Sequence, residues 1–460
     1  MYKPFPEARI LRIDLENSTT RVDTLSGELY RLYPGGSALG VYLAMQELNP
    51  RINPLSSENV LVFSVSPLTG LPISGISRMN VTAKSPLTNT IGDTQAGGFF
   101  PVHLKANGYD AIVVTGKAKQ PVYLYIHGDE VQIRDAQPIW GMVTGDAEKA
   151  IREDVERSDI EIAQIGPGGE NQVRYACIIN MCNRANGRNG MGAVMGAKNL
   201  KAIAVVKGKA QKAHDAERFF ALSKSVGQRL QENESLAGLG KYGTAGDLEG
   251  FSEEGFLPTN NWTTGFFPEG ANQLTGTTLY DTLLKERDTC FSCAVRCKRV
   301  VDVPGKIDPL YGGPEYETMS TFGSYCGVTD LTEVCYANQL CNMYGLDTIS
   351  CGATISFAME CFEKGILTKE DTGGLSLHFG NAEVLAPLIE AIANRTGIGQ
   401  LLAEGSARAA EQLGNGAEDL TITVKNQELP AHMPQYKPAV GLIYAVNPFG
   451  ADHQSSEHDP

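Results

Sequence analysis

Three cysteines within eight residues constrain this chain more strongly than any other feature of its sequence. Cys290, Cys293 and Cys297 follow the spacing C-x2-C-x3-C, which lets three sulfur atoms converge on one metal centre. The chain shows no secretion signal, and in a reducing compartment a cysteine cluster is more often metal-binding than disulfide-bonded. The spacing fits an iron–sulfur cubane, whose corners are normally held by four thiolates. A structural zinc site and a set of buried thiols are the two alternatives.

The local motif leaves one corner of such a cubane without a sulfur ligand. The chain contains ten cysteines, so the fourth ligand is either one of the other seven or a residue that this chain does not contain. The seven candidates are Cys177, Cys182, Cys326, Cys335, Cys341, Cys351 and Cys361.

Composition and charge exclude several classes of protein. With 460 residues and 42% hydrophobic content, the chain can build about two or three domains with sizeable cores, which excludes a disordered or fibrous protein. A net charge of −14 argues against a general nucleic-acid binder, because neutralising phosphates needs an excess of lysine and arginine. The sequence contains no signal peptide and no run of about 18 uncharged apolar residues. We therefore expect a cytoplasmic protein that binds neither nucleic acid nor membrane.

The pattern of apolar residues changes along the chain. Residues 11–23 predict a β-hairpin, residues 146–155 predict a helix, and further strands are expected at 59–65, 110–115, 122–126 and 202–206. After residue 208 the spacing becomes helical, at 216–226, 331–343, 355–364, 382–394 and 399–413. The predicted fold is an α+β N-terminal domain of mixed strands and helices that binds the cofactor, followed by a mainly α-helical region.

These patterns predict three domains. They are an α+β domain at 1–208, a mainly helical domain with the cysteine motif at 209–418, and the start of a third, truncated domain at 419–460. The truncation is expected because the last residues, from Gly450 onward, form neither a capped helix nor a closing strand.

A glycine-rich segment combines backbone freedom with positive charge. From Arg184 to Lys198 the chain places four glycines and three cations within fifteen residues. Glycine lets backbone N–H groups approach a ligand closely, and arginine matches phosphate oxygens with two parallel hydrogen bonds. The segment fits a phosphorylated cofactor, although it matches neither the Rossmann fingerprint nor the Walker loop. The alternative interpretation is a tight turn with close helix packing.

Other segments carry weaker signals. Arg78 precedes the pair Gly97-Gly98, an arrangement that a hairpin and a turn would explain slightly better by themselves. A carboxylate and a histidine are the usual groups for moving protons, which makes Glu315 and His453 candidates. Each has a structural interpretation as well: Glu315 could cap a helix, and an isolated histidine is more often structural. Asp347-x-x-Ser is a typical helix N-cap sequence.

Taken together, these segments resemble the aldehyde ferredoxin oxidoreductase family, which comprises tungsten-dependent and occasionally molybdenum-dependent bis-pterin enzymes. The resemblance covers essentially the whole chain in the family's order. It is carried by Gly35-Gly36, Ser66-Pro-Leu-Thr-Gly, Arg78-x-Asn80, Gly97-Gly98, Gly108-Tyr-Asp-Ala, Gly116-Lys-Ala, Ile165-Gly-Pro-Gly-Gly-Glu, the Arg184 segment, the cysteine motif, Gly-Pro-Glu315-Tyr-Glu, Gly-Leu-Asp347 and Gly-Ala-Asp-His453.

The resemblance implies roles for individual residues. Two pterin dithiolenes hold the metal, and the protein supplies no obligatory ligand to it. The resemblance implies that Arg78 and Arg184 contact the pterin phosphates. The cofactor and the Mg2+ that bridges its phosphates would be lined by Gln95, Ala96, Gly97, Ala185 and Gly187. Asn342 and Asp347 would lie at a pterin amine. Glu315 and His453 are implied as catalytic groups beside the substrate, and the three motif cysteines as ligands of a [4Fe-4S] cluster that passes electrons out.

The chain departs from the family pattern at three places. Gln95 stands where the family usually has asparagine, and Asn342 stands where a pterin motif normally has aspartate. The family's fourth cluster cysteine lies in a second pterin motif downstream of the histidine, beyond Pro460. The alternative fourth ligand is Cys351, which lies four residues after Asp347 in the first pterin motif.

The expected function is oxidation of an aldehyde and water to a carboxylic acid, two protons and two electrons. Ferredoxin or an iron–sulfur partner subunit would accept the electrons, and a homodimer is compatible with the sequence. One alternative is a non-catalytic iron–sulfur or pterin-binding homologue or fragment. Another is a family member that acts on a different substrate, such as an aromatic thioester. The sequence determines neither whether the metal is tungsten or molybdenum nor which aldehyde is the substrate.

Overall fold

The computed structural model describes residues 5–209 and 211–455. The chain divides into two compact units. Unit 1 comprises the residues up to Gln172, Ala176–Ala237 and Thr289–Arg296, and unit 2 comprises Val173–Tyr175, Gly238–Asp288 and the residues from Cys297 onward. The chain thus passes from one unit to the other within the cysteine motif. The domain boundaries expected after residues 208 and 418 stay predictions, and residues 456–460 of the expected third domain lie outside the described residues.

The first sheet of unit 1 has six strands in the order β2-β1-β6-β3-β4-β5. Its strands are β1 (Ala8–Asp14), β2 (Thr19–Leu25), β3 (Leu61–Val65), β4 (Met79–Lys84), β5 (Ile91–Ala96) and β6 (Ala111–Thr115). β1 and β2 pair antiparallel, which confirms the predicted hairpin, while β1 and β6 pair parallel. β3 and β4 are buried along their whole length, as expected for strands covered on both faces.

The second sheet of unit 1 also has six strands, in the order β11-β10-β9-β12-β7-β8. They are β7 (Val122–His127), β8 (Glu130–Asp135), β9 (Ile160–Gln164), β10 (Ile178–Asn180), β11 (Arg184–Asn186) and β12 (Leu200–Val206). β12 pairs parallel with β7 and antiparallel with β9. The glycine-rich segment therefore begins on an edge strand, β11, and continues into a helix.

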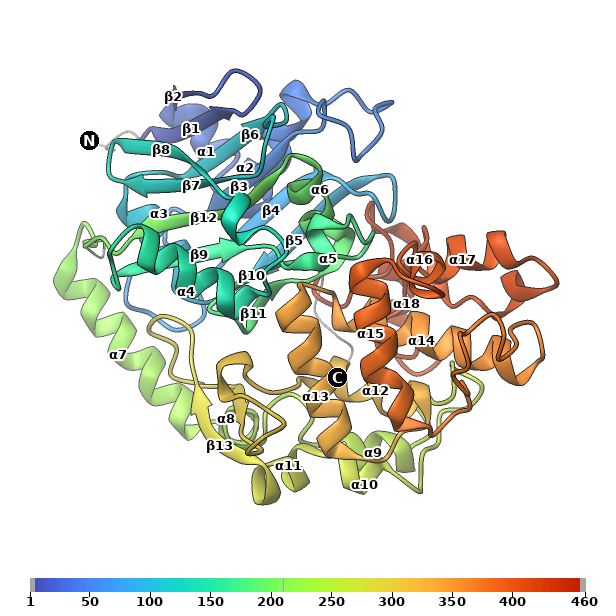
Figure 1. The fold of residues 1–460 in the computed structure, drawn as a ribbon. Helices are drawn as coiled ribbons and strands as arrows, with labels where there is room; N and C mark the ends of the chain where they lie inside the picture. Colours follow the sequence, from blue (N-terminus) through green and yellow to red (C-terminus); the bar gives the residue numbers. More distant parts are fainter. Residues whose placement is uncertain (1–4, 210, 456–460) are drawn as a thin grey trace. The chain divides into compact units, whose positions relative to one another are not determined.

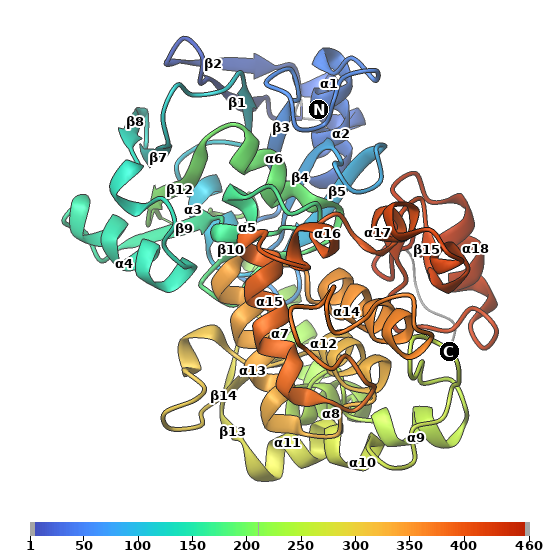
Figure 2. The ribbon, with the colours of Figure 1, turned by 45° about the vertical axis from the view of Figure 1, so that its right-hand side comes forward.

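The core of unit 1 lies between the two sheets (Figures 1 and 2). Phe63 and Val114 from the first sheet pack in one cluster with Leu124 and Ile203 from the second. α3 (Phe100–Ala106) and α6 (Met191–Ala197) add side chains to this cluster. α1 (Gly27–Leu32) and α2 (Gly36–Glu47) cover the outer face of the first sheet, and α4 (Thr144–Asp154) covers that of the second. The short α5 (Pro167–Glu170) packs on α6, and α7 (Ala216–Glu232) has no fully buried residue.

Unit 2 is mainly helical. Its helices are α8 (Glu234–Tyr242), which runs across the division at residue 237, α9 (Leu248–Glu253), α10 (Ala271–Leu274), α11 (Gly276–Thr282), α12 (Tyr316–Phe322), α13 (Leu331–Tyr344), α14 (Thr348–Glu363), α15 (Leu385–Asn394), α16 (Gly399–Leu402), α17 (Ser406–Leu413) and α18 (Pro438–Val446). Two hairpins complete it: β13 (Leu284–Asp288) with β14 (Lys298–Val301), and β15 (Thr423–Val424) with β16 (Gln427–Glu428). The cysteine motif occupies the connection between β13 and β14.

The predicted fold class is confirmed, since a mixed sheet-and-helix region precedes a helical one. One predicted helix is interrupted: residues 399–413 form α16 and α17 rather than one continuous helix. Gly405 stands at the interruption with φ 86°, a conformation that favours glycine. In the part of the chain that the structure describes, no helix is both long enough and apolar enough to cross a membrane.

Candidate functional site

Within unit 1, the two segments predicted to line the cofactor lie side by side. The side chain of Asn180 donates a hydrogen bond to the carbonyl oxygen of Gly97 at 3.2 Å. The side chain of Asn186 donates to the carbonyl oxygen of Thr94 at 2.9 Å. The end of β5 is thus joined to β10 and β11, and Gly97 is brought to the segment that begins at Arg184.

The predicted cofactor-binding residues of unit 1 differ in exposure. Arg78, Gln95 and Ala185 are exposed, Gly97 and Gly187 are half-buried, and Ala96 and Arg184 are buried. The hydroxyl of Ser77 donates to the carbonyl oxygen of Gly98 at 2.6 Å, which places the start of β4 beside the glycine pair. The guanidinium of Arg184 donates to the side-chain oxygen of Asn183.

Two buried amide oxygens stand in the same region. Among the described residues, neither Asn180 Oδ1 nor Asn186 Oδ1 accepts a hydrogen bond. A Cβ atom built on Gly98 would lie only 2.3 Å from Asn180 Oδ1, so the oxygen packs directly against that backbone. A buried polar atom without a partner has a free-energy cost. Oxygen atoms of this kind are ligands that a hard cation such as Mg2+ prefers.

The cysteine loop of unit 1 packs on the glycine pair. A Cβ atom built on Gly97 would lie 2.6 Å from the Sγ atom of Cys290. The N–H of Phe291 donates to the carbonyl oxygen of Gly98 at 3.5 Å, and the ring of Phe291 meets that of Phe99 edge-on at 6.1 Å. The N–H of Ala294 donates to Ser74 Oγ at 2.9 Å. The structure therefore brings Cys290 to the predicted cofactor-lining backbone.

The motif cysteines differ from the other seven in exposure. Cys290, Cys293 and Cys297 are half-buried, whereas the other seven cysteines are buried, and none of the ten, all of which the structure describes, forms a disulfide bond. Burial raises the pKa of the Cys182, Cys326 and Cys335 thiols well above the usual value, and that of Cys361 to about 12. Thiols of this kind stay protonated and are poor metal ligands without further rearrangement.

Among the residues that the structure describes, no group of three or more His, Cys, Asp or Glu side chains is arranged so that it could hold a metal ion. The motif cysteines are divided between the units, with Cys290 and Cys293 in unit 1 and Cys297 in unit 2. Cys351, the alternative fourth ligand, is fully buried within α14 of unit 2. The identity of the fourth ligand stays a prediction.

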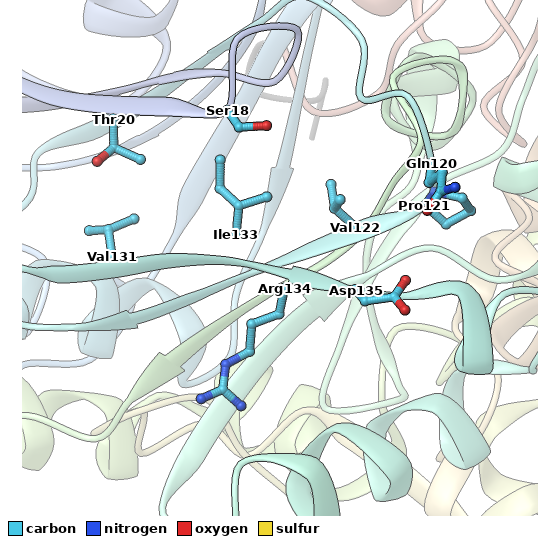
Figure 3. A pocket seen from close by; sticks show the side chains of 9 residues that line it. All are labelled: Ser18, Thr20, Gln120, Pro121, Val122, Val131, Ile133, Arg134 and Asp135. Carbon is cyan, nitrogen blue, oxygen red and sulfur yellow. The ribbon is translucent and has the colours of Figure 1, made fainter.

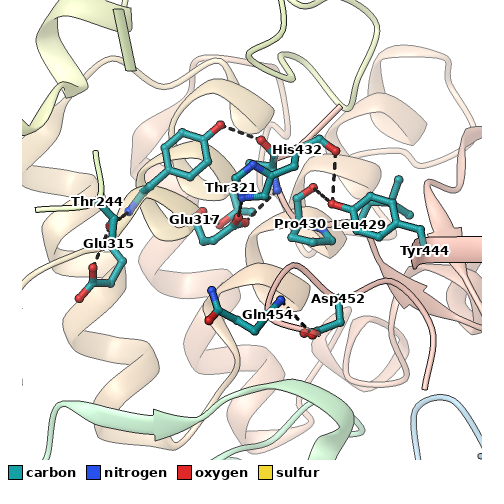
Figure 4. Close-up of polar contacts among 12 residues, drawn as sticks. Thr244, Glu315, Glu317, Thr321, Leu429, Pro430, His432, Tyr444, Asp452 and Gln454 are labelled. Carbon is teal, nitrogen blue, oxygen red and sulfur yellow. Dashed lines mark hydrogen bonds and ion pairs between the residues drawn. The ribbon is translucent and has the colours of Figure 1, made fainter. Parts of the chain in front are cut away.

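In unit 2, a buried carboxylate lies with two histidines. Glu317 lies on the first turn of α12. Its Oε1 atom is 3.0 Å from the Nε2 atom of His432. Its other oxygen, Oε2, accepts a hydrogen bond from the N–H of Ala431 at 2.8 Å. The ring of His453 stacks on that of His432, with centroids 5.7 Å apart and planes inclined by 24°. Figure 4 shows Glu317 and His432 facing each other.

The electrostatics of this cluster favour an ionised carboxylate. Burial would raise the pKa of Glu317, but the charge of His453, the close contact with His432 and the hydrogen bond from the Ala431 N–H outweigh it and lower the pKa to about 2. Burial and the nearby Glu317 charge raise the pKa values of the Tyr316 and Tyr325 phenols well above the usual value. At neutral pH the cluster thus holds an anion beside two imidazoles and two neutral phenols.

Glu315 has different partners. It occupies the N-cap position of α12, but its side chain makes no capping hydrogen bond. Thr244 caps the helix instead: its hydroxyl accepts from the N–H of Tyr316 at 2.8 Å and donates to Glu315 Oε2 at 2.8 Å. Lys298 Nζ lies 3.4 Å from Glu315 Oε1. The structure therefore ties Glu315 to Thr244 and Lys298.

Asn342 and Asp347 are both buried. The side chain of Asn342 donates to the carbonyl oxygen of Tyr311 at 3.0 Å. Asp347 is the N-cap of α14 and accepts from the N–H groups of Ile349 and Ser350 at 3.1 and 3.4 Å. This confirms the N-cap predicted from Asp347-x-x-Ser, while a carboxylate retains lone pairs for a further donor.

Sequence reasoning missed Glu317 and His432. The only signal for Glu317 was its place in Glu315-Tyr316-Glu317, which offers two carboxylates two residues apart. Glu315 is the N-cap residue with extended backbone, whereas Glu317 lies within the first turn of α12, so the two carboxylates have different partners. The sequence contains no comparable signal for His432, because this residue lies 115 residues after Glu317 in the chain.

Unit 1 also carries a groove. It has a volume of about 510 Å³ and is lined by Ser18, Thr20, Gln120, Pro121, Val122, Val131, Ile133, Arg134 and Asp135 (Figure 3). None of the predicted site residues lines it, and its walls are formed by β2, β7, β8 and the connections between strands.

Comparison with known proteins identifies two family domains. Residues 10–207 match the aldehyde ferredoxin oxidoreductase N-terminal domain, and residues 221–459 match domains 2 and 3 of the same family. The chain is 41% identical over 451 residues to a tungsten-containing aldehyde ferredoxin oxidoreductase of Pyrococcus abyssi, covering 97% of this chain and 73% of the relative. The corresponding Pyrococcus furiosus protein is 42% identical over 450 residues, with the same coverage.

More distant relatives carry other names. The chain is 32% identical over 479 residues to an aliphatic sulfonate oxidoreductase, WOR-like subunit, of Pyrococcus furiosus, covering 97% of this chain and 75% of the relative. The active site complex BamBC of benzoyl coenzyme A reductase, solved with 1,5-dienoyl-CoA, matches with a TM-score of 0.86 and 30% identity, over 96% of this chain and 68% of that one. With both family domains matched in order across the cofactor-lining segments and the cysteine loop, the chain belongs to the aldehyde ferredoxin oxidoreductase family.

Proposed function

We propose that this chain converts an aldehyde and water to a carboxylic acid, releasing two electrons and two protons. The observation that carries the proposal is the cluster of buried Glu317 with the half-buried His432 and His453, because an ionised carboxylate beside imidazoles can support proton transfer. Relatives at 41 and 42% identity are named tungsten-containing aldehyde ferredoxin oxidoreductases, which supports the same activity.

The residues of unit 1 fit a phosphorylated pterin cofactor. The cations at Arg78 and Arg184 suit its phosphates. Gln95, Ala96, Ala185 and Gly187 would line it, and in unit 2 Asn342 and Asp347 would meet its amines. A bound tungsten or molybdenum bis-pterin supplies the two-electron step of the reaction.

Magnesium between the pterin phosphates would find oxygen ligands in the same segments. The buried Oδ1 atoms of Asn180 and Asn186 accept no hydrogen bond among the described residues and are suited to a hard cation or to the water around it. We propose that the backbone of Gln95 and Ala185 joins them. This position also explains why Gln95 can replace asparagine, since a carbonyl ligand does not depend on the side chain.

Cys290, Cys293 and Cys297 would hold a [4Fe-4S] cluster next to the cofactor. The contact between Cys290 and Gly97 supports this, because it puts a potential cluster ligand on the cofactor-lining backbone. Electrons would leave one at a time to ferredoxin or to an iron–sulfur partner subunit, and the protein could also form a homodimer. The fourth ligand is either Cys351 or a residue outside this chain.

His453 and one of the two carboxylates would handle the protons. Glu315 was expected in that role, but its carboxylate pairs with Lys298 and Thr244. Glu317 lies with both histidines. We therefore propose Glu317 as the carboxylate of the proton-handling cluster, with Glu315 as the alternative.

A second candidate function has structural support. The similarity to BamBC, whose name refers to benzoyl coenzyme A reductase, favours a thioester as the alternative substrate.

The deciding experiment measures tungsten, molybdenum, iron and pterin per chain, and then turnover with aldehydes, sulfonates and aryl thioesters using a viologen acceptor. Two pterins with aldehyde turnover supports the proposal. If the protein contains pterin but turns over only sulfonates or thioesters, that substrate class replaces the aldehyde in the proposal. If it contains iron without pterin, a non-catalytic homologue is favoured.

A further inference from the structure

His432 makes two kinds of contact with the proton-handling cluster. Its Nε2 atom is 3.0 Å from Glu317 Oε1, a close polar contact that lacks the alignment of a hydrogen bond. Its ring lies against Tyr316, with centroids 5.4 Å apart, and against His453 at 5.7 Å. The hydroxyl of Tyr444 donates to the His432 carbonyl oxygen at 3.2 Å and fixes the backbone from α18. His432 is thus held between the carboxylate and the second histidine.

Both oxygens of Glu317 lie against the same segment. Oε1 faces His432, and Oε2 accepts from the N–H of Ala431 at 2.8 Å. A backbone donor on one oxygen and an imidazole 3.0 Å from the other restrict the plane of the carboxylate and stabilise its charged form. A carboxylate held in this way is a weak base at neutral pH, because the best general bases have pKa values near the working pH.

His453 is the other group of the cluster that can accept a proton. Its ring stacks on that of His432, and two charged imidazoles in this arrangement would repel each other. The anion at Glu317 lies where it would compensate a positive charge on one of the two rings. Tyr316 and Tyr325, which also feel the charge of Glu317, are buried phenols that stay neutral at physiological pH.

We infer that His432 is a positioning residue that holds the Glu317 carboxylate as an oriented anion and leaves proton transfer at the substrate to His453. This inference rests on the proposed function and deepens it. Of the two protons released per aldehyde oxidised, His453 accepts one at a ring nitrogen, becomes an imidazolium and passes it to solvent, while Glu317 remains ionised throughout. The arrangement is that of a carboxylate that stabilises an imidazolium without being protonated itself.

Two substitutions of His432 separate its contacts. His432→Gln keeps an N–H donor within reach of Glu317 but removes the ring, whereas His432→Phe keeps a ring against Tyr316 and His453 but removes the donor. With metal, iron and pterin contents unchanged, we expect His432→Phe to lower kcat by about 10- to 100-fold with little change in KM, and to shift the pH profile of kcat. His432→Gln should stay within about threefold of the parent enzyme. A parent-like rate and pH profile in His432→Phe would overturn the inference, as would equal losses in both variants.

An infrared titration provides a readout that does not depend on turnover. The absorption of the Glu317 carboxyl is obtained as the difference between the parent holoenzyme and Glu317→Gln at each pH. We expect no protonated-carboxyl band between pH 7 and 5 in the parent and its appearance in that range in His432→Phe. A band that titrates at the ordinary carboxyl pH in the parent refutes the inference. If the parent oxidises no aldehyde, the proposed function fails, but the titration still decides whether Glu317 is held as an anion.

Discussion

The Sγ atom of Cys290 lies so close to the backbone of Gly97 that a Cβ atom at residue 97 would be 2.6 Å away from it. Real Cβ atoms do not approach a sulfur atom so closely, so either the sulfur or the backbone would have to move. Glycine is needed at residue 97 because a Cβ atom would be too close to the sulfur, and not because of the backbone conformation, since φ of Gly97 is not in the left-handed region. Any side chain at residue 97 would therefore displace a predicted cluster ligand.

We predict that Gly97→Ala lowers the iron content per chain and destabilises unit 1 by about 1–3 kcal/mol, the usual cost of inserting a methyl group into a packed site. Iron analysis and thermal unfolding of the purified protein provide the two measurements. Gly227→Ala is the matched control, since nothing lies within 4 Å of a Cβ atom there. That control should be neutral or slightly stabilising, because alanine favours the helix. Full iron content in Gly97→Ala would show that the thiol does not need its observed position.

Exposure predicts which thiols react when the metal is removed. Cys290, Cys293 and Cys297 are half-buried, whereas the other seven are buried. After iron is removed with a chelator under anaerobic conditions, we expect an alkylating reagent to modify these three cysteines first, as identified by peptide mass spectrometry. The untreated protein should be protected at the same three positions. Equal labelling before and after removal of the metal would contradict their role as cluster ligands.

Much of the fold could be predicted because local patterns determined it. The alternation of Leu11, Ile13 and their polar neighbours predicted the first hairpin, and the Asp347-x-x-Ser sequence predicted a helix start that the structure contains. The break at Gly405 could not be read from spacing alone. Apolar residues on either side of it continue the helical period, and only the φ of 86° at Gly405 shows that the helix stops.

The proton-handling cluster could be predicted only in part. His453 and the pair Glu315 and Glu317 are visible in the sequence, but the choice between two carboxylates depends on which way each one points from the start of α12. Lys298 lies near Glu315, and His432 lies near Glu317. Those long-range contacts are set by tertiary packing and leave no local signal.

We predict that Arg184→Ala reduces the pterin content of the purified protein. Loss of a charge-assisted hydrogen bond to a phosphate is worth about 1.5–3 kcal/mol, which corresponds to roughly a 10- to 150-fold weaker affinity. Arg184→Lys should retain part of the cofactor, because it keeps the charge but not the fork of donors. Arg134→Ala serves as a control, since this residue pairs with Asp154 beside the groove of unit 1. Normal pterin occupancy in Arg184→Ala would exclude Arg184 from the phosphate site.

The low pKa of Glu317 predicts a dependence of stability on pH. The pKa falls from its ordinary value of 4.5 in the unfolded chain to about 2 in the folded protein. The resulting stabilisation, on the order of 3 kcal/mol, is fully present above about pH 4.5 and is lost as the pH falls toward 2. The gap in unfolding temperature between the parent and Glu317→Gln should therefore narrow from pH 6 to pH 3. Glu286→Gln, at an exposed position of β13, should show no gap at any of these pH values. A constant gap in Glu317→Gln would mean that its effect is packing and not charge.

Finally, paired substitutions at residues 315 and 317 identify the carboxylate that supports turnover. Glu317 lies with His432 and His453, whereas Glu315 is tied to Lys298 and Thr244. We expect Glu317→Gln and His453→Ala to keep their metal, iron and pterin but to lose on the order of 10²–10⁴ in aldehyde turnover, the usual size of a general acid–base contribution. Glu315→Gln keeps the hydrogen bond from Thr244 and should lose less than about tenfold. The measurement is kcat with a viologen acceptor across the pH range at matched cofactor content. The opposite ranking, with Glu315→Gln inactive and Glu317→Gln active, would assign the role to Glu315 and leave Glu317 as a structural partner of the two histidines.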